Sequence, residues 1–310
     1  MTEHSPGRRV LLVFLDGLGI GAKDPRRNPL FNARPRFLTS LLGGTLPSLG
    51  NRIIESSEAM CVPLDPNLGV RGLPQSGTGQ ATLYTGINAA RIIHQHFGPY
   101  LYSTLKPIVE AHSIFAQLKN TGHSHPVALA NAFPQRFFDY LEGPRRRIVA
   151  GMYAALTAGV RFRDIDDLKN GTAVSTDITA ERWKAIGHPD APVITPYEAG
   201  ATLARVADAQ TFTLFEYFST DKAGHEMNSA KANHVLGEVD ELLRGIYDHV
   251  DRTRTLVIVT SDHGNMEEIG IKTHTRHPVP AILFGDWKGF PKDGLVSLSH
   301  LVPSIRSFLG

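Results

Sequence analysis

Val10-Leu11-Leu12-Val13-Phe14-Leu15 is an unbroken apolar run that stops at Asp16-Gly17. A short apolar run that ends at a turn is typical of a strand buried on both faces, as in a parallel sheet. Further runs of this kind occupy residues 126–130, 211–218, 255–260 and 279–284. Segments with helical spacing lie between or after them, at 108–119, 198–207, 230–250 and 301–309. This alternation predicts an α/β fold with a doubly wound, mostly parallel sheet.

The periodic pattern is interrupted in the middle of the chain, from about residue 133 to residue 196. This segment contains Gly143-Pro144, a run of three arginines and a polar stretch, and the core pattern resumes at Tyr197. We therefore expect an α/β core made of residues 1–132 and 197–310. Residues 133–196 are expected to form a small inserted cap over it.

The composition is that of a folded globular protein, with 42% hydrophobic and 20% charged residues among 310. Lys and Arg number 32 and Asp and Glu 30, so no positive excess is present to bind nucleic acid. The single Cys61 excludes an intrachain disulfide and a cysteine-rich zinc site, and fits a reducing compartment. No apolar run is long enough to span a membrane. We expect a cytoplasmic protein with neither a nucleic-acid nor a membrane partner, whose oligomeric state the sequence does not predict.

Polar side chains follow the predicted strands at their carboxyl ends. Three are carboxylates and three are imidazoles: Asp16, Asp221, His225, Asp262, His263 and His274. Each alone has a structural alternative, because an Asp can cap a turn and a His can lie on the surface. Together they supply mixed oxygen and nitrogen donors at the sheet edge where α/β proteins build their sites. This donor set predicts two divalent ions, Mn or Zn with Mg as a further possibility.

A candidate nucleophile lies in Pro74-Gln75-Ser76-Gly77-Thr78-Gly79-Gln80, which leads into a predicted helix from Ser76 to Gly86. Ser76 could simply cap this helix. The start of a helix also stabilises negative charge, on an ionised hydroxyl or on a bound phosphate. With two ions beside it, Ser76 would attack phosphorus.

These motifs, in this order, resemble the alkaline phosphatase superfamily. The similarity extends over the chain outside the middle segment and is strongest to the branch of cofactor-independent phosphoglycerate mutase and phosphopentomutase. It implies an alkaline phosphatase-like core and a transiently phosphorylated Ser76. Because some members of the superfamily use threonine, it also makes Thr78 the alternative nucleophile. It also implies two ligand sets, one of Asp221, His225 and His274, the other of Asp16, Asp262, His263 and the Ser76 oxygen.

The chain departs from those mutases in two respects. It is much shorter, and its loop reads Gln75-Ser76-Gly77 where they have Asn and an acidic residue around the serine. We therefore expect a phosphatase that acts on a small phosphorylated metabolite through phosphoserine. An intramolecular phosphomutase, similar to either of these two mutases, is the first alternative, and a metal-binding homologue without catalysis is the second.

The middle segment holds a group of basic side chains that could bind the substrate phosphate. They are Arg136, Arg145, Arg146 and Arg147. Planar guanidinium groups match the geometry of phosphate oxygens. The alternative is a solvated basic loop.

Overall fold

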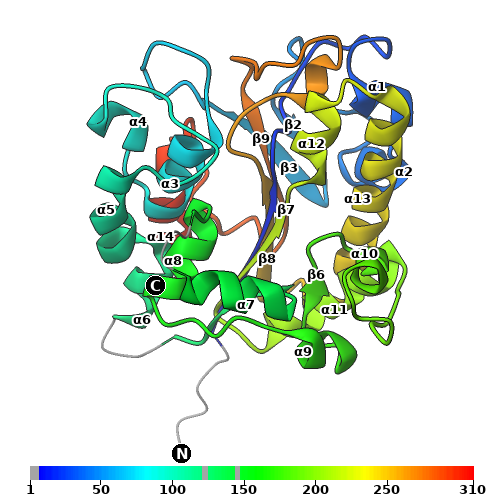
Figure 1. Cartoon of the computed structure of the whole chain (residues 1–310). Coiled ribbons are helices and arrows are strands. Elements are labelled where there is room, and N and C mark those ends of the chain that lie inside the picture. The colour runs from blue at the N-terminus through cyan, green and yellow to red at the C-terminus, as the bar shows by residue number, and fades with distance from the viewer. Residues whose placement is uncertain (1–6, 121–124, 144–146) are drawn as a thin grey trace, which may run out of the picture.

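The computed structural model describes residues 7–120, 125–143 and 147–310. Within them a seven-stranded sheet runs through the centre of the molecule (Figure 1). Its strands, in spatial order, are β2 (Ile54–Glu55), β3 (Ala59–Leu64), β9 (Val279–Gly285), β8 (Thr255–Thr260), β1 (Arg9–Leu15), β7 (Phe212–Tyr217) and β4 (Val127–Leu129). The α/β architecture predicted from the apolar runs is confirmed.

The sheet is parallel on one side and antiparallel on the other. Strands β8, β1, β7 and β4 run parallel, whereas β9, β3 and β2 pair antiparallel. The chain returns from β8 to β9 at the same edge of the sheet, so β9 must run in the opposite direction. The first residue of β9, Val279, therefore lies at the edge where the parallel strands end. The predicted α/β sheet thus has a parallel side, between β8 and β4, and an antiparallel side, from β9 to β2.

Two helical layers cover the two faces, as the alternation of side chains along β1 requires. Val10, Leu12 and Phe14 pack in one apolar cluster, and Leu11, Val13 and Leu15 pack in another. The first layer contains α3 (Ser76–Thr85), α4 (Ala89–Ile92), α5 (Lys106–His112), α6 (Ile114–Lys119), α8 (Ala150–Thr157) and α14 (Leu301–Leu309). The second contains α1 (Pro29–Ala33), α2 (Arg36–Leu41), α11 (Pro196–Asp208), α12 (Ser219–His225) and α13 (Ser229–His249). The sheet is thus doubly wound, with helices on both faces in Figure 1.

The predicted helix at 108–119 is two helices, α5 and α6, which meet at Ser113. Ser113 has an extended ψ of 149°, and its hydroxyl accepts a hydrogen bond from the Ala116 backbone N–H. A serine that caps a new helix ends the previous one, although the apolar spacing continues across it. The described residues also contain three short 3-10 helices, at Ser103–Leu105, Met266–Glu268 and Leu298–His300.

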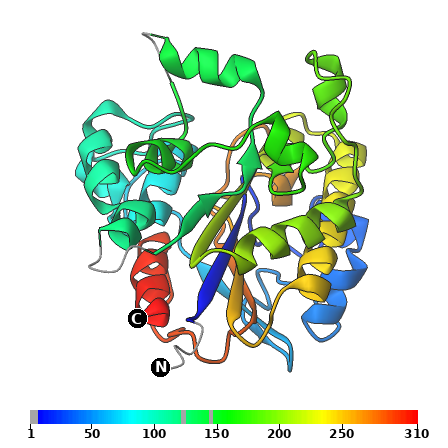
Figure 2. The same cartoon turned by 90° about the horizontal axis from the view of Figure 1, so that it is seen from below.

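The middle segment contains four helices and one short strand among its described residues. They are α7 (Gln135–Glu142), α8, α9 (Ile165–Lys169), β6 (Val174–Ser175) and α10 (Glu181–Ala185). Strand β6 pairs with β5 (Asn131–Ala132), and Trp183 packs in a small apolar cluster of its own. Figure 2 shows α7 at the periphery of the molecule. Leu141 of α7 nevertheless packs in the main apolar cluster, as does α8, which contacts α3 and α5. The division into core and cap stays a prediction, and α8 packs with the core.

Among the described residues, no helix has both the length and the apolar character that crossing a membrane requires.

Candidate metal centre

The six predicted ligands meet at the carboxyl edge of the parallel strands. Asp16 directly follows β1, Asp262 follows β8, and Asp221 lies on α12, which begins after β7. His274 belongs to the loop that precedes β9. The antiparallel direction of β9 brings this loop to the same edge. Segments more than 200 residues apart in sequence therefore supply neighbouring side chains.

The first group is formed by Asp16, Asp262 and His263, whose ligand atoms lie within 4.8 Å of one another. His263 Nε2 is 3.4 Å from Asp16 Oδ1 and 3.7 Å from Asp262 Oδ2. The Ser76 Oγ atom is 2.9 Å from the same Nε2. All four residues are buried. The proposed nucleophile and this group thus face one another.

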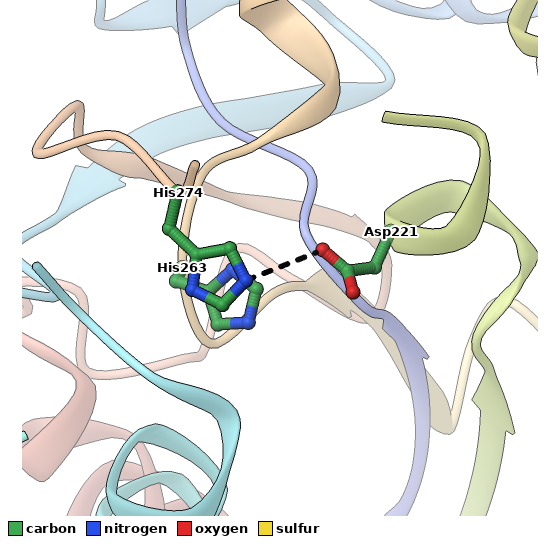
Figure 3. A group of neighbouring side chains, drawn as sticks. All are labelled: Asp221, His263 and His274. Carbon is green, nitrogen blue, oxygen red and sulfur yellow. Dashed lines mark ion pairs between the residues drawn. The ribbon is translucent and has the colours of Figure 1, made fainter. Parts of the chain in front are cut away.

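The second group is formed by Asp221, His225 and His274. Asp221 Oδ2 is 3.2 Å from His225 Nε2, and Asp221 Oδ1 is 3.7 Å from His274 Nε2. The Nε2 atoms of His225 and His274 are 3.2 Å apart. Ligand atoms of Asp221, His263 and His274 also lie within 4.8 Å of one another, as drawn in Figure 3. Because the His263 and His274 rings stack at 3.7 Å, the two groups are adjacent.

Backbone carbonyls orient two of the imidazoles. His274 Nδ1 lies 2.7 Å from the Pro74 carbonyl oxygen, and His225 Nδ1 lies 2.7 Å from that of Lys272. A carbonyl only accepts, so each Nδ1 carries a proton and each Nε2 is the atom that can bind a metal ion. At His225, metal binding would displace the proton that Nε2 donates to Asp221 Oδ2.

The carboxylates of the first group lack the partners that buried charge requires. Asp16 Oδ1 and Asp262 Oδ1 are buried without a hydrogen-bond partner. Burial, followed by the negative charges of Asp262 and Asp221, raises the pKa of Asp16 well above its usual value. A divalent cation would supply the missing partner and remove the repulsion. The residues present therefore fit a divalent metal.

The pKa of Asp221 is shifted in the opposite direction from that of Asp16. Burial alone would raise its pKa, but hydrogen bonds from His225 and Asn265 and the nearby His263 lower it to about 2. The hydrogen bond to Asp221 in turn raises the pKa of His225. The second group is thus held together by an Asp–His pair before any ion binds.

Ser76 and Thr78 have different surroundings. Helix α3 begins at Ser76, as predicted, but Gln75 is the N-cap residue and its side chain makes no capping hydrogen bond. The Ser76 hydroxyl therefore does not cap the helix and faces His263. The Thr78 hydroxyl lies 3.2 Å from the Gln75 carbonyl oxygen and accepts a hydrogen bond from the Phe97 N–H at 3.2 Å. Thr78 thus binds the backbone, whereas Ser76 points to the candidate ligands.

The glycine after Ser76 is explained by a close backbone contact. A Cβ atom on Gly77 would lie 2.2 Å from the Tyr100 carbonyl oxygen. The segment from Phe97 to Tyr100 therefore packs directly on the start of α3. An acidic residue in place of Gly77 would displace this segment.

Three polar residues that support the ligands were not predicted from the sequence. Gln80 donates a hydrogen bond from Nε2 to Asp262 Oδ2 at 3.2 Å, and Asn265 donates one to Asp221 Oδ1 at 2.6 Å. Gln80 lies one helical turn after Ser76, a spacing that could have indicated a shared face. The third residue, Glu267, lies among the loops and its partners are distant in sequence.

A further buried carboxyl lies within strand β7. Glu216 is fully buried and its Oε1 accepts a hydrogen bond from the Tyr84 hydroxyl at 2.9 Å. Burial is the main cause that raises the pKa of Glu216 to about 7. Glu216 lies within an apolar run that predicts an ordinary strand. The sequence therefore did not indicate a buried carboxyl at this position.

The predicted arginine group does not line the candidate metal centre in the described part of the structure. Arg136 lies on α7, and Arg147 is exposed. Arg147 lines a pocket of about 450 Å³ with Lys106 and Tyr153, and no candidate ligand contributes to this pocket. Arg145 and Arg146 lie outside the described residues.

Comparisons with known proteins agree with this geometry. A family model described as "Metalloenzyme superfamily" matches residues 195–295. The 2,3-bisphosphoglycerate-independent phosphoglycerate mutase of Ehrlichia ruminantium is 28% identical over 128 residues, which cover 38% of this chain and 25% of that protein. The chain spans only 18–30% of the length of the curated relatives it matches.

Solved structures share the fold over nearly the whole chain. Alkaline phosphatase from the Antarctic bacterium TAB5 superposes with a TM-score of 0.56 at 12% identity, covering 98% of each chain. Phosphoglycerate mutase from Leishmania mexicana superposes with a TM-score of 0.51 at 12% identity, covering 99% of this chain and 96% of that one. The family match, the related sequences and the shared fold together support a metalloenzyme similar to the alkaline phosphatase superfamily, near its phosphomutase branch.

Proposed function

We propose that this protein is a two-metal phosphatase that releases phosphate from a small phosphorylated metabolite through a phosphoserine at Ser76. The observation that carries the proposal is the 2.9 Å separation between Ser76 Oγ and His263 Nε2. His263 belongs to the first group, and it also offers a ligand atom within 4.8 Å of those of Asp221 and His274 in the second group. The Ser76 hydroxyl therefore lies beside the place where the two groups meet.

We assign the candidate ligands to two ions according to which of their donor atoms face one another. We assign Asp221, His225 and His274 to one ion, and Asp16, Asp262, His263 and the Ser76 oxygen to the other. Mixed carboxylate and imidazole donors favour Mn or Zn, with Mg as the alternative. When bound, such ions stabilise negative charge on the attacking and leaving oxygens of a phosphoryl transfer.

The chain itself supplies the nucleophile and its orientation. Ser76 Oγ forms a bond to phosphorus while the bond between phosphorus and the ester oxygen of the substrate breaks. The Ser76 proton passes to solvent, and the leaving oxygen takes one up. Ser76 is the first residue of α3, so the helix dipole favours negative charge at this position. Water then attacks the phosphoserine, releases inorganic phosphate and restores the hydroxyl.

Hydrolysis and intramolecular transfer differ in the access of water to the phosphoserine. A mutase must exclude water until the rearranged substrate takes the phosphate back, which requires a cover over the site. The segment from 133 to 196 is the candidate cover, and its helix α8 packs in the main apolar cluster. So small a cover favours hydrolysis, although the curated relatives are named as phosphoglycerate mutases.

The intramolecular phosphomutase therefore stays the second candidate. A metal-binding protein without catalysis would not need a hydroxyl directed at the ligands, and the orientation of Ser76 argues against it. Arg147 lines a separate pocket to which no candidate ligand contributes, so we assign it no contact with the phosphate at Ser76.

Metal analysis followed by a substrate screen tests the proposal. Purified protein loaded with Mn or Zn is incubated with phosphomonoesters, phosphodiesters and sugar phosphates, and both released phosphate and isomerised product are measured. We expect phosphate release from a phosphomonoester that disappears in Ser76→Ala. Transfer of labelled phosphate between two hydroxyls of one sugar, without release, would replace the phosphatase by the mutase.

A further inference from the structure

A buried carboxylate lies where the three loops that carry the candidate ligands meet. Glu267, in the short helix after β8, is 2% exposed. Its Oε2 accepts hydrogen bonds from the backbone N–H groups of Gly19 at 3.1 Å and Asn265 at 2.8 Å. Its Oε1 accepts one from the Thr275 hydroxyl and lies 3.0 Å from His277 Nδ1. Donors from three separate loops thus occupy both oxygens.

Three glycines leave the space that this carboxylate fills. A Cβ atom on Gly19 would lie 2.3 Å from Glu267 Cδ, and one on Gly264 would lie 2.3 Å from Oε1. A Cβ on Gly21 would lie 2.8 Å from Glu267 Cγ. The side chain therefore packs directly on the backbone of two loops, and its negative charge is satisfied by hydrogen bonds.

Each of these loops carries a candidate ligand. Gly19 is three residues after Asp16, and Thr275 directly follows His274. Asn265 is two residues after His263, and its side chain donates to Asp221 Oδ1 at 2.6 Å. Glu267 is thus connected, through its hydrogen-bond partners, to ligands of both groups.

Backbone hydrogen bonds also join these loops, and the Glu267 carboxylate lies between them. The Thr275 N–H donates to the Gly264 carbonyl at 2.9 Å, and the Met266 N–H donates to the Gly17 carbonyl at 3.0 Å. Four donors converge on the two oxygens of Glu267. A carboxylate can accept from all four. An amide of the same shape has one acceptor oxygen for the two backbone N–H groups, and its NH₂ group would require the Thr275 hydroxyl and His277 Nδ1 to change from donors to acceptors.

We propose that Glu267 is a positioning residue that holds the three ligand loops in the arrangement that binds metal. The inference rests on the candidate metal centre described above, and it assigns to Glu267 no contact with an ion. Residues that orient metal ligands commonly change metal affinity by about 10–100-fold when they are replaced. Glu267 acts through the backbone of Gly19 and Asn265 and through the hydroxyl of Thr275.

The test is the Zn²⁺ affinity of Glu267→Gln, measured on the full chain by competition with a chromophoric chelator. We expect the dissociation constant for Zn²⁺ to rise about 10–100-fold while circular dichroism shows that the metal-free protein remains folded. Glu268→Gln is the matched control, because the neighbouring Glu268 carboxylate pairs with Arg27 at 2.7 Å near the surface. This control should keep the wild-type affinity.

Two further variants separate positioning from general stability. Gly19→Ala places a methyl group against the Glu267 carboxylate and should also weaken Zn²⁺ binding. Combined with Glu267→Gln, its effect on affinity should be less than additive, because both changes act through one contact. Thr275→Val removes one of the four donors to Glu267 and should weaken Zn²⁺ binding less than Glu267→Gln does. It provides the test if Glu267→Gln does not fold.

The outcomes distinguish this inference from the proposed function. A folded Glu267→Gln protein that binds Zn²⁺ as tightly as the wild type overturns the positioning role, whatever its melting temperature. Should Glu267→Gln fail to fold, unchanged affinity in Thr275→Val overturns it instead. A wild-type protein that binds neither Zn²⁺ nor Mn²⁺ overturns the metal centre and this inference together. Zn²⁺ binding that depends on Glu267, in a protein inactive on phosphate esters, supports the inference and contradicts the proposed function.

Discussion

Replacing Asp16 by Asn should stabilise the metal-free protein while it weakens metal binding. The ligand atoms of Asp16 and Asp262 lie within 4.8 Å. Two like charges at about this distance repel by about 3.5 kcal/mol at an effective dielectric constant of about 20. Partial protonation of Asp16 relieves some of this repulsion. We therefore expect Asp16→Asn to raise the free energy of unfolding by about 1–3 kcal/mol without metal.

The pH dependence gives the sign of this effect independently. The pKa of Asp16 is raised in the folded state, so the folded metal-free protein binds more protons than the unfolded chain. Its stability should then fall as the pH rises above the unfolded value of about 4. Asp16→Asn removes this slope. The free energy of unfolding of metal-free Asp16→Asn should accordingly equal that of the wild type at low pH and exceed it most at neutral pH and above.

Thermal unfolding with chelator, and then with Zn²⁺, measures both effects. At about 2 °C per kcal/mol, the melting temperature without metal should rise by about 2–6 °C in Asp16→Asn. Zn²⁺ should raise the melting temperature of the wild type more than that of the variant, because the variant has lost a ligand. Asp293→Asn, at an exposed position, is the control and should change neither value. An unchanged metal-free melting temperature in Asp16→Asn, together with the full Zn²⁺-induced rise, would show that Asp16 neither repels Asp262 nor binds the metal.

Three further predictions concern the nucleophile, the metal affinity and the thiol. Ser76→Ala should retain metal and lose on the order of 10³-fold or more in turnover; near-normal activity there, with an inactive Thr78→Ala, would make Thr78 the nucleophile. The pKa values of Asp16 and His225 are raised in the metal-free protein, the first mainly by burial and the second by its hydrogen bond to a carboxylate. Metal must displace these protons, so Zn²⁺ affinity measured by calorimetry should increase as the pH rises from about 5 to about 8, with proton release to the buffer. An affinity independent of pH would contradict this. Burial raises the pKa of the Cys61 thiol to about 12, so a thiol reagent at pH 8 should label the protein only as fast as it unfolds. Rapid labelling of the native protein would show that β3 is accessible.

The strands of the sheet centre could be predicted because their signal is local. The run ending at Leu15 and the run at 255–260 are buried on both faces, and a candidate ligand follows each strand within two residues of its end. Strand β3 was missed because Pro63 lies within it and its neighbour β9 is far away in sequence. The antiparallel half of the sheet depends on that pairing, which the composition of neither strand indicates.

The candidate ligands could be predicted for the same reason, whereas their supporting residues could not. Asp262 and His263 lie at a strand end, where side chains from several strands converge. Gln80 and Glu267 act on groups 182 and 248 residues away. Their roles depend on how the loops fold over the sheet edge, and the residue types alone are compatible with an ordinary helix and an ordinary surface loop.

The most direct test of the central claim is to locate phosphate on the protein during turnover. The Zn- or Mn-loaded wild type is mixed with p-nitrophenyl phosphate or an active phosphomonoester from the screen, quenched in acid and analysed by peptide mass spectrometry. We predict phosphate on Ser76 in the wild type, and none on the corresponding peptide of Ser76→Ala. Turnover without any phosphorylated peptide, or with phosphate on Thr78 and not on Ser76, would contradict it.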